Sequence, residues 1–396
     1  MKKAIGLLFL GMFSVCACQK DSVPGSASEP AGTAVDVDGF PASVRKVFVL
    51  NEGGMGANNA TLDFLRISDG TYVTGAFRKM NPAVAGGLGD VGNAIAVHGD
   101  EVWVVVNNSG IVEVVSAKDE REIAALPVPS PRNIAFDDRY AYVTSWAGAF
   151  ADGCFDADGG YSVTDSANPK GRVYRIDLSS KKITGSVEVG WQPEGIACSA
   201  GKIYVANSGG IASQLPPLYA YDNTVSIIDA AAFTVVRTVE VADNLKYVFA
   251  GTDGCVYVTA SGDYGAAHSA VYLLERTGSG SMTDGATGVR KISDYVTVCA
   301  FRDDVLYFLG TESEFDWSVT THEYKGCKVR GGQESEWDFP VEANTLYGLC
   351  ALDDHTFLIG DAGDYFNPGS VICYQDGSRR WRVTAGVCPG HFAIWE

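Results

Sequence analysis

Hydrogen-bonding and aromatic side chains recur in this chain directly after short apolar segments, where strands would end. Amides, hydroxyls and carboxylates orient a ligand through hydrogen bonds, and aromatic rings supply apolar contact area. Such a set favours non-covalent binding at many points. The candidate ligand-binding residues are Asn51, Glu52, Asp90, Asn107, Asn108, Arg132, Ser145, Trp146, Trp191, Asn207, Ser208, Tyr221, Asp263, Tyr264, Phe315, Asp364, Tyr365 and His391. A single Asn or Ser there more commonly stabilises a turn, so the binding prediction concerns the set as a whole.

Sequence motifs of common catalytic sites give little support for an enzyme. Gly87 to Gly92 match GxGxxG by letter, but they precede a short strand instead of opening a helix after one, so the dinucleotide reading fails. The glycines fit a tight connection between two repeats better. The chain contains no HExxH, GxSxG or CxxC motif. We therefore expect no enzymatic activity and no cofactor. A lactonase-like or quinoprotein-like activity stays open as the less favoured alternative, because fold alone does not exclude catalysis.

Three aspartates, Asp152, Asp156 and Asp158, are the weak candidate for a calcium site. Their spacing could place carboxylate oxygens around Ca²⁺, which prefers oxygen ligands. The remainder of an EF-hand loop is missing, and an acidic loop in an acidic protein is usually simply solvated. The sequence therefore predicts no metal site, with this loop as the alternative.

The N-terminus predicts export. Lys2 and Lys3 precede the apolar stretch 4–15, which is too short to span a bilayer. Small residues then lead to Cys18, in the pattern of a bacterial lipobox. We expect residues 1–17 to be a lipoprotein signal peptide, with a plain secretory signal as the alternative.

Cys18 is the predicted lipidation site, because the residues before Cys16 follow the pattern less well. Residues 18–43 are rich in Ser, Gly, Ala, Pro and Asp and lack apolar periodicity, which predicts a flexible tether. The Gln-Lys-Asp run at 19–21 resembles the short signal that sends some lipoproteins to the outer cell surface. We therefore expect an outer-membrane protein that is lipid-anchored at the cell surface.

The net charge disfavours one class of ligand, and the positions of the cysteines predict their state. The chain has 396 residues, and 30 Lys+Arg against 48 Asp+Glu give a net charge of -18. This acidity disfavours binding to nucleic acid. Among the ten cysteines, Cys198, Cys299 and Cys350 lie inside apolar segments at equivalent repeat positions. We expect them to be buried as free thiols, although an exported protein could pair some cysteines.

The elements that must position the candidate residues are internal repeats. A β-rich motif with a central aromatic residue recurs at intervals of 55, 39, 62, 53, 50 and 50 residues. Such intervals are typical of four-stranded propeller blades with variable loops. The aromatic residues are Phe48, Trp103, Tyr142, Tyr204, Tyr257, Tyr307 and Phe357. The sequence therefore predicts an all-β, seven-bladed β-propeller over residues 44–396.

The ends of the chain predict how the ring closes. The first repeat starts at its second strand, near Lys46, and the last repeat ends with a spare first strand, 391–394. We expect the C-terminal strand to join the three N-terminal strands in one blade, which removes exposed edges. The candidate binding residues then fall in connections that share one face, whereas the other face carries tight turns.

Several segments also resemble a known family. Residues 46–53, 88–93, 107–114, 205–210, 221–229, 261–264 and 368–374 are similar to the YncE-like surface β-propeller lipoproteins, which include the BtuG type. The likeness extends from about residue 46 to residue 396. The resemblance implies capture of vitamin B12 or another corrinoid at the cell surface and transfer to a TonB-dependent, BtuB-like outer-membrane transporter. The loops at 147–170 and 211–220 do not follow the family pattern, which leaves a glycan or protein ligand as the alternative.

Overall fold

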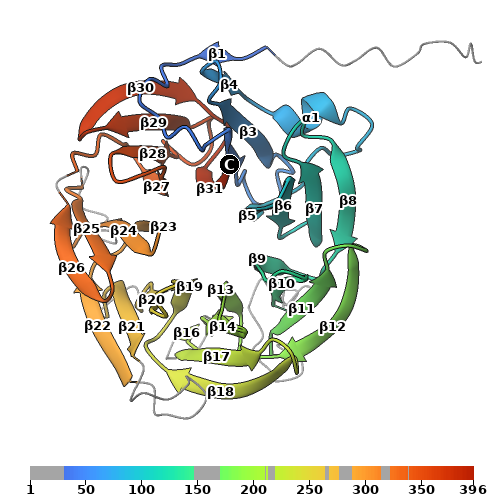
Figure 1. Cartoon of the computed structure of the whole chain (residues 1–396), viewed down its shortest axis with the longest axis vertical. Helices are drawn as coiled ribbons and strands as arrows, with labels where there is room; N and C mark the ends of the chain where they lie inside the picture. The colour runs from blue at the N-terminus through green and yellow to red at the C-terminus, as the bar shows by residue number, and fades with distance from the viewer. Residues whose placement is uncertain are drawn as a thin grey trace, which may run out of the picture.

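The computed structural model of the chain describes residues 31–146, 170–209, 211–212, 219–263, 267–275, 288–313, 322–337 and 339–396. Within these residues the chain forms a ring of seven antiparallel blades of four strands each, with the two-residue strand β1 added to the outer edge of the first (Figure 1). The predicted fold class is therefore confirmed. The first strand of each blade lies nearest the ring axis, and the fourth lies on the outer rim (Figure 1).

The first blade joins the two ends of the chain. From the axis outward it contains β31 (Pro389–Trp395), β2 (Lys46–Asn51), β3 (Thr61–Arg66), β4 (Thr71–Val73) and the short β1 (Thr33–Ala34). Blades two to four are, in the same order, β5 (Gly92–His98), β6 (Glu101–Val106), β7 (Ile111–Ser116) and β8 (Glu122–Pro127); β9 (Pro131–Phe136), β10 (Tyr140–Ser145), β11 (Arg172–Asp177) and β12 (Lys182–Glu188); β13 (Pro193–Ser199), β14 (Lys202–Asn207), β17 (Thr224–Asp229) and β18 (Thr234–Glu240).

Blades five to seven follow the same plan. They are β19 (Leu245–Ala250), β20 (Val256–Ala260), β21 (Ala270–Glu275) and β22 (Gly288–Asp294); β23 (Val298–Arg302), β24 (Val305–Gly310), β25 (Lys325–Arg330) and β26 (Gln333–Trp337); β27 (Leu346–Ala351), β28 (Thr356–Asp361), β29 (Ser370–Gln375) and β30 (Ser378–Thr384).

Burial changes with distance from the ring axis. In the second blade, β6 and β7 are almost wholly buried, because neighbouring blades cover both of their faces. The outer strand β8 is mostly exposed, and the innermost β5 is half-buried beside the channel. This gradient explains why the middle strands read as continuous apolar runs, while the outer strands carry charged residues.

The repeated aromatic residues anchor the blades. All seven lie in second strands and are at most 3% exposed. Their polar atoms are also used: the Tyr142 hydroxyl donates to Asp137 Oδ2 at 2.6 Å, and Trp103 Nε1 donates to Glu101 Oε2 at 3.1 Å. The rings therefore fill the contacts between blades, and the polar ends of Trp103, Tyr142 and Tyr307 reach carboxylates near the tight turns.

The connection from β4 to β5 contains the helix α1 (Ala76–Met80) and the glycine-rich segment 87–92, except for its last residue, Gly92, which begins β5. Gly87 and Gly89 have φ angles of 71° and 119°, and a Cβ atom on Gly92 would lie 2.6 Å from Leu50 Cδ1. These positions therefore require glycine, since a side chain would be strained or would clash. The segment forms the crossing between the first and second blades, as predicted, and β5 begins at its last residue.

The ring closes through β2 and β31. Their register runs from Lys46 opposite Trp395 to Asn51 opposite Pro389. A buried ion pair reinforces the first blade: Lys46 Nζ lies 2.6 Å from Glu120 Oε1 in the turn between β7 and β8. Removing either partner would leave an uncompensated buried charge, so this pair couples blades one and two.

The segment 33–43, which is part of the predicted flexible tether, packs against the fold. β1 pairs with the outer edge of β4, and Trp381 Nε1 of β30 donates to the Asp36 carbonyl at 2.6 Å. Phe40 packs on the apolar cluster between the first and seventh blades. The folded body therefore starts before Val44, the predicted boundary, because these side chains cover that cluster.

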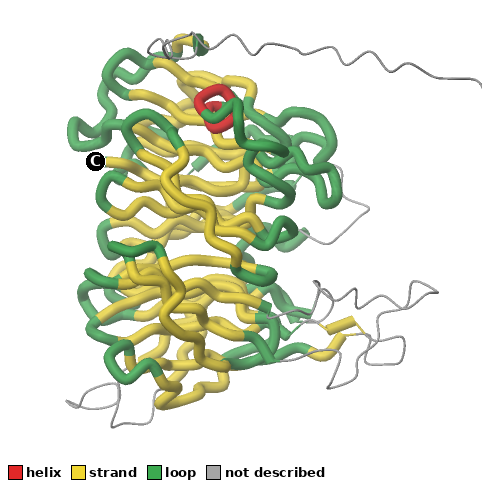
Figure 2. The backbone as a smooth tube through the Cα atoms, turned by 90° about the vertical axis from the view of Figure 1, so that its right-hand side faces the viewer, coloured by secondary structure: helices red, strands yellow, loops and turns green. Residues whose placement is uncertain are grey.

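The two faces of the ring differ (Figure 2). The turn face carries the C-terminus and the connections after the first and third strands, which are short except where residues 276–287 connect β21 to β22, so the prediction of tight turns on this face is wrong for the fifth blade. The loop face carries the connections between second and third strands and between blades. From it projects the hairpin of β15 (Ile211–Ala212) and β16 (Tyr219–Ala220). Over the described ranges, no helix has the length and apolar character needed to cross a bilayer.

Replacing the buried Trp103 with alanine should lower the free energy of unfolding by about 3–5 kcal/mol, because the missing ring leaves a cavity between the second and third blades. Urea denaturation followed by circular dichroism measures this change. Phe366→Ala is the matched control, since this ring is 86% exposed and its loss should change stability by less than about 0.5 kcal/mol. Equal effects of the two variants would contradict the assigned packing.

Candidate functional site

The beginnings of the innermost strands converge on the loop face around a hollow of about 550 Å³, here called the well. This volume lies within the range of roughly 300–1,000 Å³ that is usual for small-molecule sites. The ionisable residues and tyrosines that line it are Glu52, Arg132, Glu194, Lys246, His322, His391, Tyr247, Tyr324, Tyr347 and Tyr365. Amides and hydroxyls complete the wall, from Asn93, Asn133, Thr297, Asn344 and Thr345. The well is therefore rich in hydrogen-bonding groups contributed by several blades.

Arg132, the second residue of β9, is fixed from two sides. Its Nε atom donates to both carboxylate oxygens of Glu194 in β13, at 3.1 and 3.0 Å. Its guanidinium carbon lies 4.3 Å from the centroid of the Trp146 ring. The charge pair and the cation–π contact hold the guanidinium plane in one orientation at the wall. A ligand would therefore meet a preorganised arginine, which reduces the entropy cost of binding.

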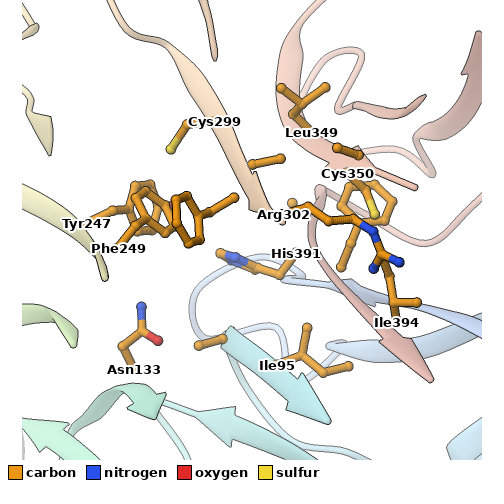
Figure 3. A pocket seen from close by; sticks show the side chains of 16 residues that line it. Ile95, Asn133, Tyr247, Phe249, Cys299, Arg302, Leu349, Cys350, His391 and Ile394 are labelled. Carbon is orange, nitrogen blue, oxygen red and sulfur yellow. The ribbon is translucent and has the colours of Figure 1, made fainter. Parts of the chain in front are cut away.

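A second polar cluster lies across the ring, where the first and seventh blades meet. The Tyr347 hydroxyl donates to Glu52 Oε2 at 2.5 Å. His391 Nε2, from β31, is 4.0 Å from the same oxygen. Figure 3 shows the His391 ring reaching from β31 into the channel toward Tyr247. The carboxylate, phenol and imidazole can therefore present donors and acceptors to one ligand group.

Burial controls protonation in this cluster. It raises the pKa of Glu52, against the smaller opposing effects of the Tyr347 hydrogen bond and nearby positive charges. Burial also lowers the pKa of His391 to about 4, assisted by the positive charges of Lys246 and Arg132. The imidazole is consequently uncharged at neutral pH. The cluster can hydrogen-bond a ligand at neutral pH without an imidazolium charge.

Exposed apolar side chains lie in loops of the same face as the well, and one of them, Tyr365, also lines it. Met55, Tyr365 and Phe366 are 73%, 51% and 86% exposed, and we call them the lip. The Tyr365 ring packs edge-on against Tyr347, with ring centroids 5.8 Å apart. Large exposed apolar side chains next to polar groups are typical of an interaction site. The loop face therefore combines a polar well with an apolar border.

Several predicted residues use their polar atoms to hold neighbouring loops. Asn107 Nδ2 donates to the Pro131 carbonyl at 2.9 Å, and Asn207 Nδ2 donates to Thr224 Oγ1 at 3.0 Å. These bonds fasten crossings between strands and blades, as the turn-stabilising alternative expects. The predicted residues bonded in this way are Asn51, Asn107, Ser145, Asn207 and Ser208.

Three predicted aspartates order their own loops. Asp90 accepts from Asn108 Nδ2 at 2.7 Å and from the Gly56 amide at 2.9 Å. Asp364 accepts from the backbone amide of Phe366 at 3.0 Å. Asp263 accepts from the backbone amide of Ala267 at 2.8 Å. Their carboxylates therefore shape the loops that carry the lip and the rest of the loop face.

Other predicted residues lie away from the well or outside the described residues. Trp191 is exposed, with Lys170 Nζ 5.0 Å from its ring centroid, and Tyr221 is half-buried. Neither lines the well. The predictions for Tyr264, Phe315, the aspartates Asp152, Asp156 and Asp158, and the lipidation site Cys18 lie outside the described residues. Of the predicted set, the structure brings together Glu52, Arg132, Tyr365 and His391 at the well, with Trp146 against Arg132.

Glu194, Tyr247 and Tyr347 also line the well, although they are not among the residues predicted from the sequence. They lie near the starts of innermost strands, whereas the prediction concentrated on the loops between second and third strands. An alignment of the repeats could have found these residues. In four repeats a polar residue stands two positions before an apolar one, in Asn93-Ala-Ile, Arg132-Asn-Ile, Glu194-Gly-Ile and Lys246-Tyr-Val. Residues in this column of the repeat point to the ring axis.

The described part of the chain contains no candidate metal site, and its cysteines are free thiols. There, no group of three or more His, Cys, Asp and Glu side chains is arranged to hold a metal ion. Seven cysteines in that part are free; of the three predicted to be buried free thiols, Cys350 is buried, whereas Cys198 and Cys299 are half-buried. Burial raises the pKa of Cys299 and of Cys350 to about 12, so both thiols stay protonated.

Comparison with known proteins supports the fold. The chain is similar in structure to hydrazine synthase of Kuenenia stuttgartiensis, with 15% identity, a TM-score of 0.55, and coverage of 76% of this chain and 88% of that one. It is also similar to a functionally unknown protein from Desulfotomaculum acetoxidans DSM 771, with 10% identity, a TM-score of 0.56, and coverage of 88% and 98%. No protein-family model and no curated protein matches the sequence. At these identities the likeness concerns the propeller fold alone.

The lowered pKa of His391 predicts a pH-dependent stability. Between the unfolded pKa near 6.5 and the folded value of about 4, the unfolded chain binds more protons than the folded protein. His391 therefore makes its full contribution to the free energy of unfolding above pH 6.5. This contribution is lost as the pH falls toward 4, and the loss is at most about 3 kcal/mol. Urea denaturation across this range should show a shallower slope for His391→Gln than for the unchanged protein.

Proton NMR titration provides a direct measurement for the same residue, because the chain has five histidines. The resonance that disappears in His391→Gln should titrate near pH 4. A midpoint at 6 or above, or an unchanged stability slope in the variant, would contradict the lowered pKa of the half-buried imidazole.

Proposed function

We propose that the protein is a non-enzymatic lipoprotein of the outer cell surface that binds a corrinoid on its loop face and passes it to a TonB-dependent outer-membrane transporter. The observation that carries this proposal is the combination of a polar, charge-balanced well with an apolar lip at one end of the ring. The resemblance of segments throughout the mature domain to YncE-like surface lipoproteins supports the same ligand class.

The chemistry of the well suits a large ligand fringed with amides. Arg132 is paired with Glu194, and Lys246 and Glu52 add one formal charge of each sign. A nearly neutral ligand would therefore meet many donors and acceptors without a strong net field. Asn, Thr and Tyr side chains along the wall can each accept from or donate to an amide.

The size of the well suggests how such a ligand would bind. A corrinoid is larger than a hollow of about 550 Å³, so the macrocycle would lie across the mouth with part of its fringe in the well. Met55, Tyr365 and Phe366 would then contact its apolar face or edge. Contacts spread over several rigid blades would favour affinity, because little of the scaffold must be ordered on binding.

A glycan is the second candidate ligand. Exposed aromatic rings such as Tyr365 and Phe366, next to the Glu52 carboxylate, are the residue types that pack on sugar rings and bind hydroxyls. We prefer the corrinoid because the resemblance to YncE-like surface lipoproteins implies this ligand. The two candidates differ in a simple assay, since a corrinoid absorbs visible light and its binding can be followed directly.

Calorimetric titration of the purified protein with cyanocobalamin should show binding. Arg132→Gln and the double variant Tyr365→Ala/Phe366→Ala should each weaken binding by about tenfold or more, the equivalent of about 1.4 kcal/mol for a lost charged hydrogen bond or apolar contact. His355→Ala is the matched control, because this exposed side chain lies in a turn of the opposite face. Absence of heat at high micromolar ligand rejects the corrinoid, and equal weakening by the control rejects the site.

The lipid anchor has its own test. Cys18→Ser should move the protein from the detergent phase to the aqueous phase in a Triton X-114 partition, because no acyl chain can be attached. Cys16→Ser should leave the partition unchanged and serves as the matched control. Retention of Cys18→Ser in the detergent phase would contradict the proposed anchor.

A further inference from the structure

The strand β7 carries one carboxyl group on a face that is otherwise apolar. Ile111 and Val115 of this strand pack on the apolar cluster between the first and second blades. Alternate residues of a strand point to the same side of the sheet, so Glu113, which lies between them, points into the same cluster. On the neighbouring strand β6 it stands opposite Val104, another member of the cluster. Glu113 is therefore an acid placed in the contact between two blades.

This carboxyl group is buried without a partner. Glu113 is 2% exposed, and its Oε2 atom accepts no hydrogen bond from any of the described residues. A carboxylate without a donor or a cation is costly to bury, whereas the uncharged acid is tolerated far better. Burial accordingly raises the pKa of Glu113 to about 7, and repulsion from Glu122 adds to this effect. The packing therefore favours the protonated acid.

Residues 76–91, here called the α1 connection, pack on the same cluster through Phe77 and Leu88. Figure 1 shows α1 on the outer side of the ring, between β3 and β8. Asn81, directly after α1, fastens the connection to the hairpin of β7 and β8. Its Nδ2 donates to the Glu120 carbonyl at 2.8 Å, and its Oδ1 accepts from the Glu122 amide at 2.9 Å. The hairpin that holds Glu113 is thus joined to the α1 connection by hydrogen bonds and by apolar contact.

The α1 connection also holds a loop of the loop face. Asp90 accepts from the Gly56 amide at 2.9 Å, and Asn58 Nδ2 donates to the Gly86 carbonyl at 3.2 Å. These bonds fix residues 54–59, which include Met55 of the lip. A movement of the α1 connection would therefore reach the loop face.

The charged groups around this contact do not neutralise Glu113. Those on the strands, turns and connection packed around it are Lys46, Arg78, Lys79, Asp90, Glu120 and Glu122. Lys46 is already paired with Glu120. Arg78 and Lys79, in the last turn of α1, are exposed. Of these groups only Glu122 shifts the pKa of Glu113, and its carboxylate has the same sign of charge. An ionised Glu113 would therefore gain no stabilising ion pair from them.

We propose that Glu113 is a proton-dependent switch: the α1 connection stays closed against the second blade while this carboxyl is protonated, and it opens and releases residues 54–59 when the proton leaves to solvent. In the open form the carboxylate reaches water, where the pKa of a glutamate is near 4.5. The closed form holds the proton more tightly, so the open fraction rises about tenfold for each pH unit between about 4.5 and 7 and is constant above this range. The switch does not depend on which ligand the loop face binds.

Hydrogen–deuterium exchange of the full chain, followed by mass spectrometry at about pH 4.5 and about pH 7.5, tests the switch in peptides that cover 54–59 and 76–91. Comparison with Glu113→Gln at the same pH removes the intrinsic pH dependence of amide exchange. At the higher pH these peptides should exchange at least about tenfold faster in the unchanged protein than in Glu113→Gln, and at the lower pH the two should agree within about threefold. Equal exchange of the two proteins at the higher pH would overturn the proposal.

Two further variants and a second region complete the test. Glu113→Met also lacks the charge and should slow exchange in the same way, so slowing by either substitution supports the switch. Glu188→Gln changes an exposed glutamate at the end of β12 and is the matched control, which should exchange like the unchanged protein. Peptides of the fifth blade, 245–260, should exchange equally in all four proteins.

Three results of these comparisons would also overturn the switch. Slowing that extends equally to the fifth blade would show a change of global stability in place of a local opening. Equal slowing by Glu188→Gln would show that position 113 has no special role. Faster exchange in both Glu113 variants would show that the carboxylate stabilises the closed form.

Discussion

The pairing of β31 with β2 brings residues near the C-terminus against the first full strand of the chain. Six blades are continuous in sequence, but the first can be completed only by this long-range contact. The innermost strand of that blade also carries His391, and the loop after its second strand carries Glu52. Closure therefore does more than remove two sheet edges. It assembles the polar cluster of Glu52, Tyr347 and His391 from opposite ends of the chain.

Repetition made most of the fold predictable. Each repeat places one aromatic residue in a second strand, and all seven of these residues are buried where the pattern put them. The spare strand near His391 predicted the closure. The first blade lacks its innermost strand, and the C-terminal strand has no other blade to join, so the two complete one blade. The packing of 33–43 was not predictable, since Asp36 and Phe40 sit in a stretch whose composition is that of a linker.

The site was only partly predictable, for a geometric reason. Asn107 and Asn207 stand at strand ends beside the loop face, but their amides turn toward neighbouring backbone and side chains. Sequence gives the residue type and not the direction of the side chain. Glu194 and Tyr347 point to the axis because innermost strands begin there, which becomes clear when the repeats are aligned by strand and not by loop. The contributions of several blades meet only once the ring exists.

The docked segment 33–43 has a mechanical consequence for a chain held at its N-terminus. Traction applied upstream of Thr33 would first peel the two-residue β1 from β4 and then pull Asp36 away from Trp381. The load would reach Lys46 and the closing strands only after these outer contacts had separated. In a chain held upstream of Thr33, these outer contacts would yield before the closing strands, and the ring would keep its geometry while the segment before it moved.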